Sequence, residues 1–77
     1  MDHIAPTFTR VTLRAASHVH ADIMDAAGGT VRVVYDGRMD AGNRTMTIDA
    51  SSLPAGNYFI RIETGDGIVA KTLVVAH

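Results

Sequence analysis

Two-residue alternation of apolar and polar side chains dominates this 77-residue chain. The segments that alternate most strictly are residues 10–14, 18–23, 45–49 and 58–63. Such alternation is typical of antiparallel strands that place one face on a core and the other in water. Two more uniformly apolar, β-branched runs, 31–35 and 68–75, predict central strands that are covered on both faces.

The glycines separate the predicted strands from one another. Glycine adopts positive φ without steric cost and therefore marks turns. All seven glycines are expected in turns between these runs, and Thr64-Gly65-Asp66-Gly67 predicts a tight hairpin with a primed turn. The strands are predicted at residues 8–14, 18–24, 31–36, 44–49, 57–63 and 67–75, with a short seventh strand near 38–40. No segment longer than ten residues keeps a helical period.

Regularly spaced short strands predict an all-β fold, an antiparallel immunoglobulin-like β-sandwich of six to seven strands. A local feature supports this fold: Gly56 precedes Tyr58, which opens a strand, by two residues. This spacing is typical of a tyrosine corner, in which the phenol hydroxyl bonds to backbone a few residues upstream. The alternative is an ordinary loop followed by a core tyrosine. We expect one domain over residues 1–77, with a core of about 5–75.

Composition narrows the classes of function. Apolar residues make up 47% of the chain and charged residues 19%, which argues against disorder. A net charge of −1 gives no electrostatic footprint for nucleic acid or an anionic membrane. Cysteine is absent, so disulfides and thiolate metal sites are excluded. We therefore expect no nucleic-acid partner and no direct membrane insertion.

Candidate chemistry is sparse. His18 and His20 share one strand face with Asp22, which makes these three residues weak metal candidates. The alternative is a solvated sheet face that carries two histidines. No serine or carboxylate has the partners that catalysis needs, so neither a catalytic residue nor a cofactor is predicted. Phe59 is out of phase with Tyr58 and Ile60, and we expect it to face outward.

The C-terminal third carries a more specific pattern. Its residues are Leu53, Pro54, Gly56 and Tyr58, then Gly65 and Gly67, then Lys71, Val74 and Val75. This Leu-Pro-x-Gly-x-Tyr segment, with its glycine hairpin and terminal Lys-x-x-Val-Val, resembles the C-terminal sorting domains of the type IX secretion system, in their type A, immunoglobulin-like form. The upstream residues Asp25, Gly28, Val31 and Gly42 fit the same family, and the resemblance extends over about residues 5–75.

The resemblance implies a sorting signal rather than a catalyst. Such a domain directs a passenger protein, attached in cis, from the periplasm through an outer-membrane translocon to the cell surface or the medium, and a sortase then typically removes it. The chain would then be a domain excised from the C-terminus of a larger secreted protein. An accessory structural or adhesion module of a bacterial surface protein or enzyme is the alternative function.

The final strand is the natural candidate for recognition, since the last strand of a sandwich can lie at a sheet edge. An exposed edge offers unpaired backbone donors and acceptors that another chain can extend. We expect Lys71 and the backbone of residues 73–75 to face a receptor. The alternative is a core strand with one solvated lysine.

Overall fold

Six β-strands make up the fold, which is known from a computed structural model that describes residues 7–50 and 52–76. The strands are β1 (Thr7–Leu13), β2 (Ser17–Asp25), β3 (Thr30–Met39), β4 (Gly42–Ile48), β5 (Gly56–Thr64) and β6 (Gly67–Val75). All six predicted strands are confirmed. Residues 5 and 6 of the expected core lie outside the described part of the chain. Among the described residues, no helix is long and apolar enough to cross a membrane.

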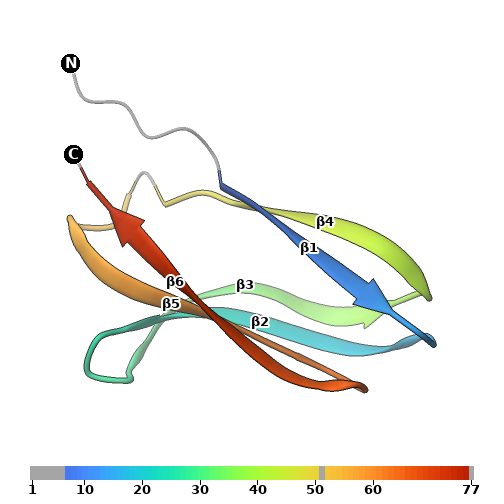
Figure 1. The fold of residues 1–77 in the computed structure, drawn as a ribbon. Helices are drawn as coiled ribbons and strands as arrows, with labels where there is room; N and C mark the ends of the chain where they lie inside the picture. Colours follow the sequence, from blue (N-terminus) through green and yellow to red (C-terminus); the bar gives the residue numbers. More distant parts are fainter. Residues whose placement is uncertain (1–6, 51, 77) are drawn as a thin grey trace.

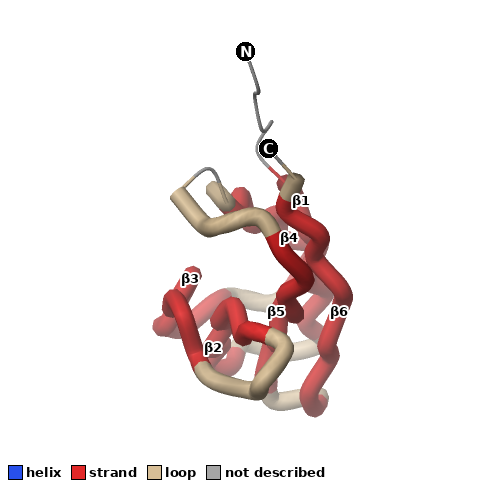
Figure 2. The backbone as a smooth tube through the Cα atoms, turned by 90° about the vertical axis from the view of Figure 1, so that its left-hand side faces the viewer, coloured by secondary structure: helices blue, strands red, loops and turns tan. Residues whose placement is uncertain are grey.

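The strands form two antiparallel sheets that pack face to face (Figures 1 and 2). The smaller sheet is β1-β4, and the larger sheet has the order β3-β2-β5-β6. The immunoglobulin-like β-sandwich that the alternation predicted is therefore confirmed. The inward faces of both sheets and the loop after β4 supply the core, whose buried apolar members are Val11, Leu13, Val19, Ala21, Ile23, Met46, Ile48, Ala50, Leu53, Tyr58, Ile60, Ile62, Leu73 and Val75.

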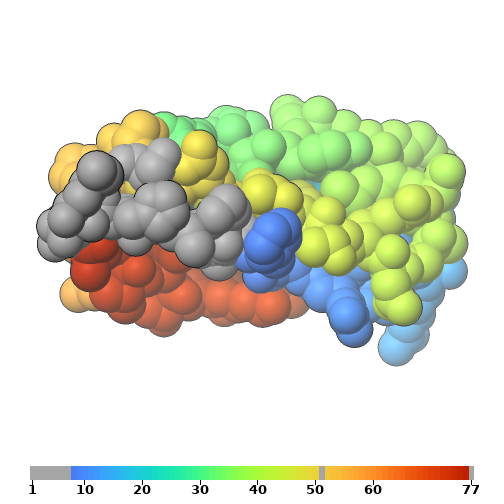
Figure 3. All heavy atoms as spheres, turned by 90° about the horizontal axis from the view of Figure 1, so that it is seen from above, coloured from blue at the N-terminus to red at the C-terminus, as the bar shows by residue number. Residues whose placement is uncertain are grey.

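The prediction that the two uniformly apolar runs form central strands is wrong. β3 and β6 are the two edge strands of the larger sheet, and β2 and β5 lie between them. Both edge strands carry exposed apolar side chains, such as Val33 (53% exposed) and Val74 (65% exposed). Figure 3 shows β3 and β6 along opposite sides of β1 and β4. The Val33 and Val74 side chains lie on the outer face of the larger sheet, which no described strand covers, so they stay exposed although the runs are apolar.

The predicted seventh strand near residues 38–40 is also wrong, because β3 continues without a turn to Met39. Gly37 lies opposite Val19 within the antiparallel ladder, and Arg38 lies opposite His18. The pairing with β2 thus carries β3 past the glycine that was expected to end it. Asp40 lies outside the strand.

The two hairpins of the larger sheet differ in how their turns are built. Thr64 pairs with Gly67, so Gly65 and Asp66 form the predicted tight turn between β5 and β6. Neither turn residue has positive φ, so the turn is not of the primed type; Gly67, with φ of 130°, has the positive value instead. Asp25 holds the β2–β3 turn. Its Oδ1 accepts hydrogen bonds from the backbone amides of Ala27 and Gly29, at 3.0 and 2.9 Å.

Candidate functional site

The candidate recognition strand β6 lies at an edge of the larger sheet. Within the described residues, β6 pairs with β5 on one side and with no strand on the other. Leu73 and Val75 are buried in the core, whereas Val74 between them is 65% exposed on the outer face. The expectation that the last strand lies at a sheet edge is therefore confirmed. Along residues 73–75, a partner could reach only the backbone edge and the Val74 side chain.

Lys71 lies on the inward face of β6, opposite Ile60 of β5. Residues directly opposite each other in an antiparallel pair share one face of the sheet. The Lys71 side chain reaches across the space between the two layers, and its Nζ donates a hydrogen bond to Oγ1 of Thr9 on β1 at 3.2 Å. Thr9 itself is only 6% exposed. Lys71 is exposed to solvent and at the same time links the two sheets through this hydrogen bond.

A groove with a volume of about 350 Å³ runs between β1 and β6. Val11 and Arg10 line its β1 side, and Val69 and Lys71 line its β6 side. Ile62 of β5 contributes to its lining and is buried. The groove therefore joins an apolar interior to a rim that carries two basic residues and one acidic residue, Asp66, whose Oδ2 accepts a hydrogen bond from the Arg14 amide at 3.4 Å.

The Leu-Pro-x-Gly-x-Tyr segment forms the loop that leads into β5. The Tyr58 hydroxyl donates a hydrogen bond of 2.7 Å to the backbone carbonyl of Pro54, four residues upstream. Tyr58 and Leu53 are each 7% exposed, and the Leu53 amide bonds to the Ala50 carbonyl at 3.1 Å. The predicted tyrosine corner is confirmed. Tyr58 and Leu53 therefore hold this loop against the core, while Pro54 and Gly56 are exposed on its outside.

Of the two hairpin glycines in the motif, Gly65 is constrained by its surroundings. A Cβ at Gly65 would lie 3.1 Å from the Cβ of Ser17, closer than side-chain contacts normally allow. The Gly65 amide also donates to the Ser17 hydroxyl at 3.2 Å. The hairpin tip is therefore docked against the start of β2, which fixes the direction in which β6 begins.

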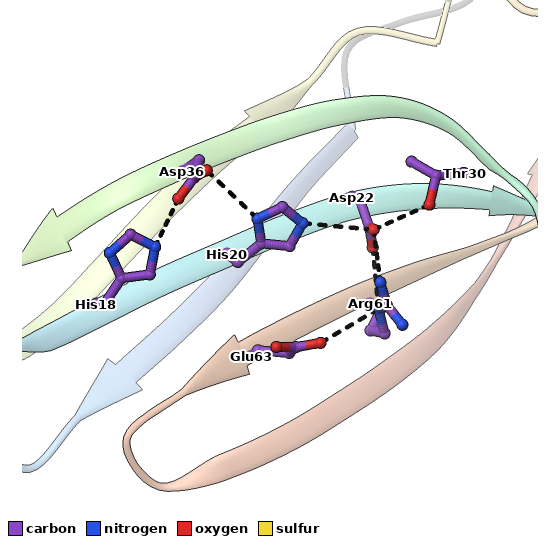
Figure 4. Close-up of polar contacts among 7 residues, drawn as sticks. All are labelled: His18, His20, Asp22, Thr30, Asp36, Arg61 and Glu63. Carbon is purple, nitrogen blue, oxygen red and sulfur yellow. Dashed lines mark hydrogen bonds and ion pairs between the residues drawn. The ribbon is translucent and has the colours of Figure 1, made fainter.

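The three weak metal candidates belong to a ladder of polar side chains on the outer face of the larger sheet (Figure 4). His18 Nε2 lies 2.5 Å from one oxygen of Asp36, and His20 Nδ1 lies 3.7 Å from the other. His20 Nε2 lies 3.5 Å from Asp22, which contacts Arg61 in turn. Within the described residues, no group of three or more His, Cys, Asp or Glu side chains has the geometry to hold a metal ion.

Asp22 was expected on a solvated face, yet it is only 1% exposed. Neighbouring side chains cover it, and Arg61 donates two hydrogen bonds to its carboxylate, from Nε at 3.2 Å and from Nη2 at 2.8 Å. Burial alone would raise the pKa of Asp22, but the hydrogen bonds and charge of Arg61, with a smaller contribution from His20, lower it below its usual value. In turn, the hydrogen bond with Asp22 and the negative charge of Asp22 raise the pKa of Arg61. Asp22 is therefore a buried, charged structural residue.

Comparison with known proteins assigns the chain to a family. Residues 5–76 match the family model described as the secretion system C-terminal sorting domain. The chain belongs to this family. No curated protein and no solved structure was found to match it.

Membership of this family decides the function. The domain is a C-terminal sorting signal for type IX secretion, and nothing supports the alternative of an accessory adhesion module. Such a signal implies a passenger protein in cis, a secretion machinery that handles it, and export to the cell surface or the medium. The sorting domain thus presents its partners with a folded two-layer body that has an edge strand at its C-terminal end.

Two features of the sorting domain were missed by sequence reasoning. The groove between β1 and β6 joins strands that are 54 residues or more apart in the chain, so periodicity gives no sign of it. The second feature is the role of Arg32. Its guanidinium donates hydrogen bonds to the Asp49 carbonyl at 2.7 Å and to the Ser52 hydroxyl, so it links β3 to the loop after β4. An arginine inside an apolar run was the available signal for Arg32.

Proposed function

We propose that this sorting domain carries its passenger from the periplasm through an outer-membrane translocon, and that a cell-surface sortase then removes the domain. In this account the domain supplies a surface to be recognised and performs no catalysis itself. Its net charge of −1 favours protein partners over nucleic acid or an anionic lipid surface. Support for these finer steps comes from the family, whose domains are sorting signals.

We place the recognised surface on the C-terminal half of β6. The observation that carries this proposal is the backbone edge of β6 that no described strand pairs with, next to a Val74 side chain that is 65% exposed. A partner strand that pairs with residues 73–75 would gain main-chain hydrogen bonds, and a partner pocket for Val74 would add specificity. The buried side chains of Leu73 and Val75 hold that edge rigid, which lowers the entropic cost of binding.

Substitutions on the two edge strands test this placement. Val74→Asp puts a charge on the outer face of β6, and Val33→Asp is the matched control, because Val33 is 53% exposed on the other edge strand of the same sheet. Each variant is fused behind a reporter in a bacterium that has the type IX system, and the exported and retained reporter are measured. Lys71→Glu is included as a third variant.

We expect Val74→Asp and Lys71→Glu to reduce export several-fold, and Val33→Asp to leave it near the wild-type level. Thermal melts of the isolated domains show whether each variant is folded, since a poorly folded signal would fail for a different reason. Export of Val74→Asp and Lys71→Glu at wild-type efficiency would rule out this surface. An equal loss with Val33→Asp would show that the recognised surface is not confined to β6.

A further inference from the structure

The N-terminal half of β6 has an inward face that the smaller sheet does not cover. Val69 lies opposite Ile62 and so points to the same side as the core, yet it is 53% exposed, whereas Leu73 further along the same face is 7% exposed. An inward-facing valine in a complete sandwich would be buried by the opposite layer. Val69 lines the groove between β1 and β6, whose volume is about 350 Å³.

The free edge of β6 borders this groove. A strand added beside β6 would extend the larger sheet by main-chain pairing, and its inward side chains would enter the groove. The side chains of the added strand that lie closest to Val69 and Ile62 would meet an apolar surface. The inward side chain opposite Lys71 would meet the ammonium group, with Arg10 lining the groove from the β1 side.

A second copy of the chain is a poor occupant for this edge. Lys71 is the one lysine of the chain and lies at the centre of the nine-residue strand. Two β6 strands that pair antiparallel with full overlap would place Lys71 directly opposite its own copy, and like charges in that position are destabilising. An inward-pointing charge on an edge strand is a common device against self-association.

The two sides of the sandwich are linked by different side-chain hydrogen bonds. Between β3 and the loop after β4, the Arg32 guanidinium bonds both to a backbone carbonyl and to the Ser52 hydroxyl. The β1–β6 side is held near the groove by the Lys71–Thr9 hydrogen bond, at 3.2 Å. A carboxylate offered to Lys71 would replace a neutral acceptor with an anionic one, which adds the attraction between opposite charges to the hydrogen bond.

We infer that the groove between β1 and β6 accepts an extended segment of a partner protein in which an acidic side chain is flanked, at every second position, by apolar ones. The apolar side chains lie over Val69 and Ile62, and the carboxylate binds Lys71 and Arg10. This inference rests on the proposed function in one respect, namely that β6 is the strand that a partner approaches. It adds the chemistry of that partner segment.

A synthetic peptide tests the chemistry without the secretion machinery. The probe is Val-Thr-Val-Thr-Glu-Thr-Val-Thr-Val, N-methylated at alternate residues so that it can pair along one edge only. A second peptide carries Lys in place of the central Glu. Each is titrated into the isotope-labelled domain, and amide shifts are followed by proton–nitrogen correlation spectra. The Lys71→Met variant removes the cation of the groove, and Arg38→Met, on β3, removes an exposed cation elsewhere as a matched control.

We expect the Glu peptide to shift amides of residues 67–75 and 10–12 and to leave those of β3 unchanged. It should bind about fivefold or more tightly than the Lys peptide, as expected when attraction to an exposed cation replaces repulsion. Lys71→Met should remove most of that preference, and Arg38→Met should retain it. Equal binding of the two peptides, shifts centred on β3, or no binding at millimolar peptide would overturn the inference.

The two proposals fail in different ways. If the peptides behave as expected but the β6 variants are exported normally, the groove binds acidic strands and the export receptor uses another surface. If the β6 variants block export but the peptides do not bind, β6 is the recognised strand and the partner chemistry inferred for the groove is wrong.

Discussion

The tyrosine corner offers the sharpest test of how this small sandwich is stabilised. Tyr58→Phe removes one hydroxyl and nothing else, so it deletes the 2.7 Å hydrogen bond to the Pro54 carbonyl while the ring stays in the core. Tyr35→Phe is the matched control. The Tyr35 hydroxyl also donates to a backbone carbonyl, that of Arg38 at 3.1 Å, but in an exposed setting where water can replace it.

The expected magnitudes follow from burial. A net hydrogen bond contributes about 1 kcal/mol, and more when its loss leaves a buried group unpaired. Because Pro54 lies in an exposed loop, water can reach its carbonyl after the substitution, and we expect Tyr58→Phe to cost about 1–1.5 kcal/mol. For a domain of this size, 1 kcal/mol lowers the melting temperature by about 4–8 °C. Tyr35→Phe should cost less than about 0.5 kcal/mol.

Urea denaturation followed by far-ultraviolet circular dichroism measures both variants. Small domains have urea slopes of about 1 kcal/mol per molar, so the midpoint of Tyr58→Phe should fall by about 1 M with an unchanged slope. Equal midpoints for the two variants would refute the reasoning, because they would show that the buried corner contributes no more than an exposed hydroxyl. A changed slope would show that the substitution alters compactness instead.

Three further outcomes are expected from the same structure. Asp22→Asn should lower the free energy of unfolding at pH 7 by about 1–3 kcal/mol, because a buried charge-assisted pair loses its charge. Since the folded-state pKa of Asp22 is lowered, the wild-type carboxylate stabilises fully above the usual value of about 3.9 and this contribution is lost as pH falls through the folded pKa. Acid titration should therefore destabilise wild type more than Asp22→Asn, and parallel pH curves would contradict this. Ile23→Ala, at a fully buried position, should cost about 2–5 kcal/mol against less than about 0.5 for Val33→Ala at an exposed one, and similar urea midpoints would count against the layering. Excess zinc should leave the melting temperature unchanged, because no group of three or more His, Cys, Asp or Glu side chains among the described residues has the geometry to hold a metal ion, whereas a rise would reveal a site.

The sequence was sufficient for the strands because each of their patterns is local. Val19, Ala21 and Ile23 are buried as their alternation predicted, and Phe59 is 41% exposed on the outer face as its phase predicted. The tyrosine corner also depends on a few neighbouring residues, from Pro54 to Tyr58. Local spacing determines such features, so they can be recognised without knowing how the strands pair.

Strand order could not be predicted because it depends on pairing between distant segments. The apolar runs of β3 and β6 suggested central strands, but an edge strand can also carry apolar side chains on both its inner and its outer face. The burial of Asp22 has the same origin. It becomes covered and paired only because the register of β2 with β5 places it opposite Arg61, 39 residues later.

Export of a reporter tests the central claim most directly. A reporter protein is fused ahead of residues 5–77 and expressed in a bacterium with the type IX system and in a matched strain that lacks the translocon. If the domain is the sorting signal, the reporter reaches the cell surface or the medium in the first strain and stays in the periplasm of the second. Equal release from both strains, or equal release of the reporter without the domain, would contradict the assignment of this chain as the sorting signal.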